Sequence, residues 1–400
     1  MNQQPTTNNK QQTTNNQQPT TNNQQPTTER AYWLAWSKIP RLGPVLVYRI
    51  WQHFGSLEEA WTVPATALAE VEGLGGKLVD AVVQGRSRIN PEELLAQHRE
   101  ENPCFWTPAD EEYPRLLLEI PSPPSVLYYQ GQTELLENQG ITPAIAIVGT
   151  RSPTEHGRRW TRKISGILAK SGFVIVSGLA AGIDGEAHQG CLEVGGRTIA
   201  VLGTGVDRVY PWRHQELFEI ISQQGLLLSE YAVGTKPDRG NFPARNRIIA
   251  GLSRAVLIME APEKSGALIT ARYGNEFGRD VYALPHSPDN LQYHGCLKLL
   301  RNGAGMIVGE EELLSMLGAI PALDNKDWNV AQEKKVEVKS LPDLSPELMR
   351  VIKAIAHEPT SFDVIVTNTG ITASSVSAAL VQLELLGLVS QLPGMRYQRC

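Results

Sequence analysis

The chain has 400 residues, of which 37 are Lys or Arg and 42 are Asp or Glu, so its net charge is −5 at pH 7. This length is too great for one small core and suits two or three domains. A chain with a net negative charge has no overall attraction to nucleic acid, and any such site must be a local basic patch.

The cysteines argue against two classes of protein. They are far apart in the sequence and show no Cys-x-x-Cys spacing. This argues against a structural zinc site and a disulfide scaffold and favours a reducing compartment. No apolar run reaches the length of a membrane span, and the N-terminus lacks the apolar core of a signal peptide. We therefore expect a cytoplasmic protein with no metal and no membrane partner.

Residues 1–28 are predicted to be a disordered tail rich in Gln, Asn, Pro and Thr. The sequence Gln-Gln-Pro-Thr-Thr-Asn-Asn stands at 3–9 and again at 17–23. No position of this repeat is apolar, so it can form neither a coiled coil nor a core. No function is assigned to it.

Residues 29–102 show helical periodicity and are predicted to form a small helical domain. Two similar segments, Ile39–Pro44 and Val71–Gly76, each place a glycine-containing hairpin before a helix. They resemble the helix-hairpin-helix or SAM-like unit, whose hairpin amides can contact DNA phosphates. A packing or interaction bundle fits at least as well, because only Arg41 and Lys77 add charge at the hairpins.

Residues 103–318 alternate between apolar strands and amphipathic helices. After two strand-like pieces, the pattern predicts strands at 144–149, 173–177, 198–202, 226–229, 255–260, 280–284 and 305–308. Helices are predicted between them, at about 154–171, 184–194, 213–223, 245–252, 265–277 and 291–301. Repeated βα units of this length indicate an α/β fold with a doubly wound parallel sheet, which binds ligands at the carboxyl ends of its strands.

The turn after the strand at 144–149 is a candidate anion site. The apolar run leads into a glycine turn, Ser152 and Thr154 are typical helix N-cap residues, and Pro153 suits the first helical position. A helix N-terminus presents free N–H groups and a positive dipole end, and the Arg151 guanidinium could grip a phosphate there. An ordinary turn with a solvated arginine is the alternative.

Two segments are locally basic. Each carries five cations and one carboxylate, which is a net charge of +4. The cations are Arg151, Arg158, Arg159, Arg162 and Lys163 in the first segment, and Lys236, Arg239, Arg245, Arg247 and Arg254 in the second. Because charge runs are usually solvated faces, the patches alone leave nucleic-acid binding open.

The second patch contains the segment Phe242–Arg247, in which two arginines flank Asn246 shortly after a proline. Arg245 and Arg247 at a helix start, with Phe242 as a stacking platform, suit a nucleic-acid backbone. A helix N-terminus that pairs with nearby carboxylates is the alternative.

The familiar nucleotide motifs are missing. Gly203-Thr-Gly205 lacks the third glycine of the dinucleotide fingerprint, and no Walker-type phosphate loop occurs. Asp184 and His188, four residues apart at a helix start, could act as acid and base or bind a metal. We favour a structural interpretation, in which Asp184 caps the helix and His188 is a hydrogen-bonded core residue. No catalytic residue, metal ligand or cofactor is therefore assigned.

Residues 319–340 are polar with mixed charge and are predicted to be a linker. The last domain, 341–400, resembles a winged helix with a hairpin-like end. Its predicted helices are 345–357, 361–369 and 373–386. The recognition-helix candidate, 372–386, contains no Lys or Arg and lacks the electrostatic attraction that dominates DNA affinity. We therefore expect this domain to contact protein.

Five motifs follow one another along the chain. They are Ile147-Val-Gly-Thr-Arg-Ser152, Ser177-Gly-Leu-Ala-x-Gly-Ile-Asp-x-x-Ala-His188, Tyr210-Pro211, Phe242-Pro-x-Arg-Asn-Arg-Ile-Ile-Ala-Gly-Leu-Ser253 and Ser265-Gly-x-Leu-Ile-Thr-Ala271. Together they resemble the DNA-processing protein A family (DprA, also called Smf). The resemblance extends from about residue 31 to the end of the chain and includes both flanking domains.

This resemblance implies an extended Rossmann-like domain that binds single-stranded DNA without catalysis and without a cofactor. It also implies a homodimer that protects incoming DNA and loads a RecA-type recombinase during natural transformation. By position, the DNA-phosphate role falls to Arg151, Ser152, Ser177, Gly178, Arg245, Asn246 and Arg247, with Phe242 beside them.

Two places depart from the family pattern. His286 stands where the family usually has Gly, and Tyr293–Leu300 replaces the usual Ser-x-Gly-x-x-x-Leu-Ile. An alternative from another class stays open, because Rossmann-like folds also serve nucleotide-phosphate-binding hydrolases. Such an enzyme should carry a Pro-Gly-Gly-x-Gly-Thr loop with a catalytic Glu or Arg nearby, and neither is evident in the sequence.

Overall fold

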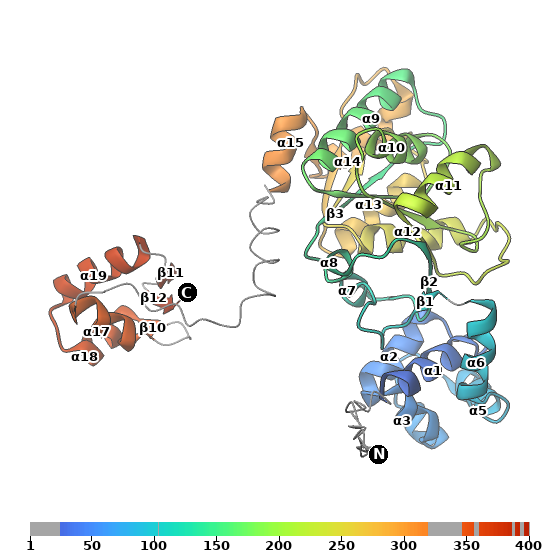
Figure 1. Ribbon diagram of the computed structural model, residues 1–400, viewed down its shortest axis with the longest axis horizontal. Coiled ribbons are helices and arrows are strands. Elements are labelled where there is room, and N and C mark those ends of the chain that lie inside the picture. Colours follow the sequence, from blue (N-terminus) through green and yellow to red (C-terminus); the bar gives the residue numbers. More distant parts are fainter. Residues whose placement is uncertain are drawn as a thin grey trace, which may run out of the picture. The chain divides into compact units, whose positions relative to one another are not determined.

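The computed structural model describes residues 25–102, 104–318, 346–355, 360–385, 389–392 and 396–399. The chain divides into two compact units, residues 1–322 and 323–400 (Figure 1). The predicted linker at 319–340 and most of the predicted polar tail lie outside the described residues. The end of that tail is helical, because α1 (Gln25–Ser37) begins inside it.

The first unit is built on a nine-stranded sheet with the order β1-β2-β6-β5-β4-β3-β7-β8-β9. The strands are β1 (Phe105–Trp106), β2 (Leu127–Gly131), β3 (Ala144–Val148), β4 (Val174–Ser177), β5 (Thr198–Leu202), β6 (Leu226–Ser229), β7 (Ala255–Ile258), β8 (Asp280–Ala283) and β9 (Gly305–Met306). Neighbouring strands from β6 to β9 all pair in parallel. The predicted α/β fold with a doubly wound parallel sheet is confirmed for these strands.

The edge formed by β1 and β2 departs from a wholly parallel sheet. β2 pairs antiparallel with β6, with Tyr128 opposite Ser229, and β1 pairs antiparallel with β2. Both strands precede the βα repeat, so no crossover helix constrains them to run parallel to their neighbours. The sheet is therefore mixed, with an antiparallel edge on a parallel body.

The strand order contains a switch point. From β3 the chain moves outward through β4, β5 and β6, and it then crosses back to β7 and moves outward the other way through β8 and β9. β3 and β7 are neighbours, with Val148 opposite Ile258 near their carboxyl ends. The loops after these two strands leave in opposite directions, which opens a crevice at this edge of the sheet.

Helices connect the parallel strands as predicted. They are α9 (Glu155–Lys170), α10 (Ile183–Leu192), α11 (Gln215–Gln224), α12 (Asn241–Gly251), α13 (Ala267–Glu276) and α14 (His294–Arg301), and α15 (Glu310–Leu317) follows β9. α9 packs against α10, and α12 packs against α13. α12 begins before the predicted start at 245, because Pro243 lies in its first turn, where no backbone N–H is needed.

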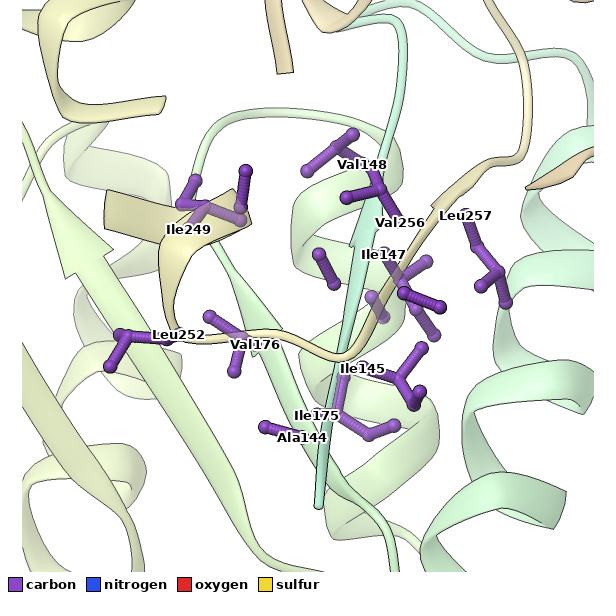
Figure 2. Packing of buried hydrophobic residues seen from close by; sticks show 14 of the residues in the cluster. Ala144, Ile145, Ile147, Val148, Ile175, Val176, Ile249, Leu252, Val256 and Leu257 are labelled. Carbon is purple, nitrogen blue, oxygen red and sulfur yellow. The ribbon is translucent and has the colours of Figure 1, made fainter. Parts of the chain in front are cut away.

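The core of this unit consists of the uninterrupted apolar runs of the central strands. All five residues of β3 are buried, as are those of β4 and β7. Figure 2 shows Ile145 and Ile147 of β3 among side chains of β4, β7 and α12. Full burial of one such side chain contributes about 1.5–3 kcal/mol. The buried strands therefore fix the backbone positions at which the loops after their carboxyl ends begin.

The helical region before the sheet belongs to the same compact unit as the sheet. Its helices are α1, α2 (Pro44–Phe54), α3 (Leu57–Thr62), α4 (Ala65–Leu68), α5 (Gly76–Arg86) and α6 (Pro91–Glu101). α2 and α5 each begin directly after a glycine N-cap. The domain is tied to the sheet region by the Arg30 guanidinium, 4.1 Å from the centroid of the Phe105 ring, and by Tyr48, which donates a 3.0 Å hydrogen bond to the Leu118 carbonyl.

The second unit has the helices and the hairpin of a winged helix. Its elements are α17 (Pro346–Ala354), β10 (Thr360–Ser361), α18 (Phe362–Thr369), α19 (Ala373–Leu385), β11 (Val389–Leu392) and β12 (Arg396–Arg399). β12 lies between β10 and β11 in the sheet. Three helices and a wing are therefore confirmed. In the described parts of both units, no helix combines the length and the apolar character needed to cross a membrane.

Candidate nucleic-acid interface

A cleft opens at the carboxyl ends of the strands, at the switch point between β3 and β7. Its volume is about 650 Å³. The polar and aromatic side chains around it include Arg151, Asp184, Tyr210, Arg239, Phe242, Arg245, Asn246 and Lys264. Four of these side chains are cations and one is a carboxylate, so the cleft is positive although the chain as a whole is negative.

The loop after β3 is held from both sides. The Thr150 amide donates a 2.7 Å hydrogen bond to the Glu260 carbonyl, just after β7, and the Ile183 amide at the start of α10 donates to the Thr150 carbonyl at 3.1 Å. These bonds join three strand-end segments that are far apart in the sequence. Arg151, the next residue of the loop, therefore projects from a fixed backbone.

The start of α9 is organised by a buried carboxylate. Thr154 is the N-cap of α9 and accepts a hydrogen bond from the Gly157 amide at 3.2 Å. The Thr154 amide and hydroxyl both donate to the buried Glu260 carboxylate, at 3.0 and 2.8 Å. Pro153 precedes the cap and is not the first helical residue, which corrects the prediction. The α9 N-terminus is thus occupied by the protein's own groups.

Arg151 and two aromatic rings form one wall of the cleft. The Arg151 side chain is exposed, and its Cζ atom lies 5.5 Å from the centroid of the Phe242 ring. The centroid of the Tyr210 ring lies 5.2 Å from that of Phe242. Phe242 can pack here because residue 203 is glycine, where a Cβ atom would be 2.7 Å from the ring. A cation beside partly exposed rings suits a phosphate followed by a base.

Three cations reach solvent at the cleft. They are Arg151 after β3, Arg239 in the loop after β6, and Lys264 in the loop after β7. In the described part of the chain, none of the three is paired with a carboxylate. Their charges are therefore available to an anion in the cleft.

Arg245 also lines the cleft, but it is a buried structural group. Only 4% of its surface is exposed, and its guanidinium donates to the Gly178 carbonyl at 2.6 Å and to the Val201 carbonyl. Burial lowers the pKa of Arg245 to about 10. Asp184 is buried near it and accepts a 3.2 Å hydrogen bond from the Gly178 amide; burial raises the pKa of this carboxyl, and Arg245 opposes the rise.

Arg247 does not line the cleft, contrary to our expectation. Its Nη1 and Nη2 atoms both bond the Glu230 carboxylate, the former at 3.0 Å, and its Nε atom donates to the Ser122 carbonyl at 3.1 Å. Burial alone would lower the pKa of Arg247, but the Glu230 carboxylate raises it above the ordinary value. The carboxylate-paired alternative for this helix start therefore describes Arg247.

Two of the predicted residues lie beneath the cleft. The Ser177 hydroxyl is fully buried and donates a 2.6 Å hydrogen bond to the Ile147 carbonyl, which joins β4 to β3. Gly178 leaves room for Arg245, because a Cβ atom at residue 178 would be 2.6 Å from that guanidinium. Both residues shape the cleft through packing, and neither offers a side chain to a ligand.

Two others are accessible. Ser152 is exposed next to Arg151, and its amide donates to the Thr150 hydroxyl at 3.3 Å. Asn246 lines the cleft and donates a long 3.4 Å hydrogen bond to the Gly266 carbonyl. Of the eight predicted residues, the four that present a side chain at or near the surface of the cleft are Arg151, Ser152, Phe242 and Asn246.

Most cations of the first basic patch form ion pairs and do not line the cleft. Arg158 and Arg162 on α9 both pair with Glu186 of α10, and Lys163 pairs with Glu310. Arg159 is exposed on α9 and does not line the cleft. The two patches therefore meet at the cleft through only some of their members, with Arg151 from the first and Arg239 and Arg245 from the second.

The structure decides the interpretation of Asp184 and His188. His188 is fully buried and forms a 2.7 Å hydrogen bond with the Thr198 hydroxyl, and burial lowers its pKa to about 3. It is therefore a neutral core residue, as favoured. Asp184 binds loop amides and does not cap the helix through its side chain. Within the described residues, no group of three or more His, Cys, Asp or Glu side chains is arranged to hold a metal ion.

Three residues of the cleft had no assigned role in the sequence analysis. Arg239 was counted in a patch, Tyr210 was part of a motif, and Lys264 was not singled out. Their positions in the sequence could have identified them. Each lies in a loop after a strand of the parallel sheet, and such loops meet at the edge formed by the carboxyl ends of the strands.

The two departures from the family pattern lie together. The His286 and Tyr293 rings stack with centroids 4.4 Å apart, and His156 forms a 2.8 Å hydrogen bond with the Tyr293 hydroxyl. Neither His286 nor Tyr293 lines the cleft. The departures therefore pack together beside the start of α9, outside the lining of the cleft.

A Rossmann-like sheet with a positive, ring-lined cleft at its switch point defines a class of α/β proteins suited to phosphate-containing ligands. The comparison with protein families is more specific. Residues 104–318 match the model of DNA recombination-mediator protein A, and residues 336–395 match that of the DprA winged helix domain. The chain belongs to the DNA recombination-mediator protein A family.

Individual relatives agree with this assignment. Protein Smf of Synechocystis sp. is 56% identical over 393 residues, which cover 93% of this chain and 99% of that protein. DNA processing protein DprA of Streptococcus pneumoniae is 39% identical over 248 residues, 62% of this chain and 86% of that one. The X-ray structure of a Streptococcus pneumoniae DprA aligns with a TM-score of 0.61 and 33% identity, covering 71% of this chain and 95% of that one.

Proposed function

We propose that the cleft binds single-stranded DNA and leaves it chemically unchanged. Arg151, Arg239 and Lys264 contact phosphates, and the Phe242 and Tyr210 rings stack with bases. Ser152 and Asn246 contribute polar contacts at the rim, while Ser177, Gly178 and Arg245 hold the cleft in shape. Arg247, which does not line the cleft, stabilises α12 through its ion pair with Glu230.

The observation that carries this proposal is the wall of Arg151, Phe242 and Tyr210. The Arg151 Cζ atom lies 5.5 Å from the Phe242 ring, which lies 5.2 Å from the Tyr210 ring, so a site for a phosphate adjoins two sites for stacked bases. Single strands expose the base faces that such rings need, whereas a duplex keeps its bases stacked inside. Membership of a DNA recombination-mediator family is in accord with a DNA ligand.

The proposed function predicts a strong preference for single-stranded over duplex DNA. Binding of labelled oligonucleotides of equal length in both forms is to be compared by anisotropy across a range of salt concentrations. We expect single-strand affinity to fall with salt by about 0.7 logarithmic units per phosphate contact for each logarithmic unit of salt. Equal affinity for the two forms near physiological salt would contradict the proposal.

Two carboxylates, Asp184 of the cleft lining and the fully buried Glu260, support binding without hydrolysis. Asp184 accepts hydrogen bonds from loop amides, and Glu260 bonds Thr154. Each therefore has a structural task that general acid–base work would disturb. Nucleoside monophosphates incubated with the protein should release no free base, and turnover at a rate that Arg151→Ala reduces would favour the hydrolase alternative.

From the family we also propose a homodimer that protects single strands and hands them to a RecA-type recombinase during natural transformation. The family description, recombination mediator, is the support for this proposal. Sedimentation of the purified chain addresses the dimer. The rate at which recombinase filaments assemble on single strands already coated by another single-strand-binding protein, with and without this protein, tests the loading.

Removal of residues 341–400 should leave single-strand affinity within about tenfold of the full chain, a change below roughly 1.4 kcal/mol. The reason is that α19, the recognition-helix candidate, contains no Lys or Arg, and the cleft lies wholly in the first unit. Anisotropy with the truncated protein, after its fold is checked by circular dichroism, is the measurement. A larger loss in a folded protein would assign the winged helix to the DNA.

A further inference from the structure

An exposed tryptophan follows Tyr210, a residue of the ring-lined wall of the cleft, two positions later in the chain. Trp212 has 77% of its surface exposed, the largest value among the exposed large hydrophobic side chains of the described residues. It is two residues from Tyr210, which lines the cleft and is itself 42% exposed. Two residues span at most about 7 Å of backbone, so the Cα atoms that carry the two rings are close together.

The backbone that carries Trp212 is anchored to the floor of the cleft. Trp212 begins the short 3-10 helix Trp212–His214. The His214 ring forms a 3.0 Å hydrogen bond with the Leu179 carbonyl and packs on Gly185, whose added Cβ would be 2.8 Å from it. These contacts tie the turn to the loop after β4 and to α10. The Trp212 ring is therefore displayed from a positioned turn, which reduces the entropy lost when a ligand stacks on it.

The residues next to Trp212 in the chain suit a polyanion with bases. Arg213 is exposed beside it and has no carboxylate partner in the described part of the chain. Among the exposed large hydrophobic side chains of the described residues, Tyr210 at 42% and Val233 at 44% are the nearest to Trp212 in the sequence. Aromatic rings next to cations are the pattern of single-strand binding surfaces, and Trp212 stands between Tyr210 and Arg213 in the chain.

We propose that a single strand leaving the cleft continues past Tyr210 and stacks a base on Trp212, with Arg213 on the adjoining phosphate. This inference rests on the proposed function and extends its site by about one nucleotide. Arg151, Phe242, Tyr210, Trp212 and Arg213 then form one track, in which three aromatic rings lie between two cations.

The test uses the full chain and oligothymidine of two lengths, about six and about twenty nucleotides, chosen to bracket a small single-strand site. Stacking of one base is worth about 1–3 kcal/mol, so Trp212→Ala should weaken binding of the long strand by about five- to 150-fold. The short strand, held within the cleft, should change by less than about twofold. Trp212→Phe should retain most of the affinity, and Trp212→Leu should behave like the alanine variant.

A spectroscopic readout separates stacking from a structural effect. Oligothymidine should quench the tryptophan fluorescence of the parent, and this quenching should be largely absent in Trp212→Phe, although that variant still binds. Arg213→Ala should flatten the salt dependence of long-strand binding by about 0.7 in slope. Leu291→Ala is the matched control, because Leu291 is 68% exposed and lies outside the cleft.

The possible failures are distinguishable. If the parent binds neither length, the proposed function fails. If the parent binds both lengths and Arg151→Ala weakens this binding, but Trp212→Ala binds both lengths like the parent, the extension is overturned. Loss of long-strand affinity in Trp212→Ala, with quenching absent in Trp212→Phe, supports the track.

Discussion

Arg151→Ala is expected to weaken single-strand binding by about ten- to a hundredfold, largely regardless of base sequence. Arg151 is exposed, unpaired in the described part of the chain, and positioned beside the Phe242 ring by a loop bonded to two other segments. A charge-assisted contact is worth roughly 1.5–3 kcal/mol when it is lost. The slope of log affinity against log salt should also flatten by about 0.7. Anisotropy titrations at several salt concentrations measure both effects.

Arg159→Ala is the matched control for this experiment. Arg159 carries the same charge, belongs to the same basic patch and is exposed on α9, but it does not line the cleft. Its removal should leave the affinity within about twofold of the parent, because distant exposed charges are largely screened. An Arg151→Ala protein that is folded and binds like the parent would show that the phosphate site is elsewhere.

Arg247→Ala should lower the free energy of unfolding by about 3–5 kcal/mol. The substitution removes one partner of a buried, two-pronged ion pair and leaves the Glu230 carboxylate without its cation. The Ser122 carbonyl also loses its donor. Because Arg247 does not line the cleft, the variant should bind single strands with a parent-like salt slope wherever it is still folded. Urea unfolding measures the free energy of unfolding. Anisotropy titrations with labelled single strands at low temperature measure the salt slope of binding.

Two further variants sharpen this prediction. Arg254→Ala, from the same patch, removes an exposed side chain and should change stability by no more than about 0.5 kcal/mol. Arg247→Met combined with Glu230→Gln leaves no buried charge unpaired and should recover part of the loss. If Arg247→Ala were as stable as the parent but weak in DNA binding, the phosphate role first expected for Arg247 would be restored.

The elements of this protein could be predicted from sequence because their signals are local. Ala144–Val148 is a five-residue apolar run, which is stable only when both faces of its strand are covered, and such a strand belongs in a parallel sheet. The amphipathic period likewise predicted a helix at about 154–171, where the structure has α9 at Glu155–Lys170. Arg151 was identified for the same reason, since a turn after a buried strand places its residue at the ligand edge wherever the strand lies.

The order of the strands, and with it the cleft, was decided only by the tertiary structure. No local pattern shows that β7 returns to lie beside β3, yet this neighbourhood brings Arg151 to Lys264. The antiparallel edge of β1 and β2 has the same origin, because two short apolar strands pair with whatever edge the fold presents to them.

Arg245 and Arg247 show which properties of a residue are determined by the sequence and which depend on the tertiary structure. The sequence by itself determined that Arg245 and Arg247 stand at a helix start and carry positive charge. A helix turns about 100° per residue, so residues two apart face different directions, one toward the cleft and the other toward Glu230. Whether a cation meets a ligand or a carboxylate depends on what packs against its face of the helix, and Glu230 and Ser122 are brought there by distant parts of the chain. Charge and helix position were therefore determined locally, whereas the partner of each guanidinium was decided by the packing of the sheet and its loops.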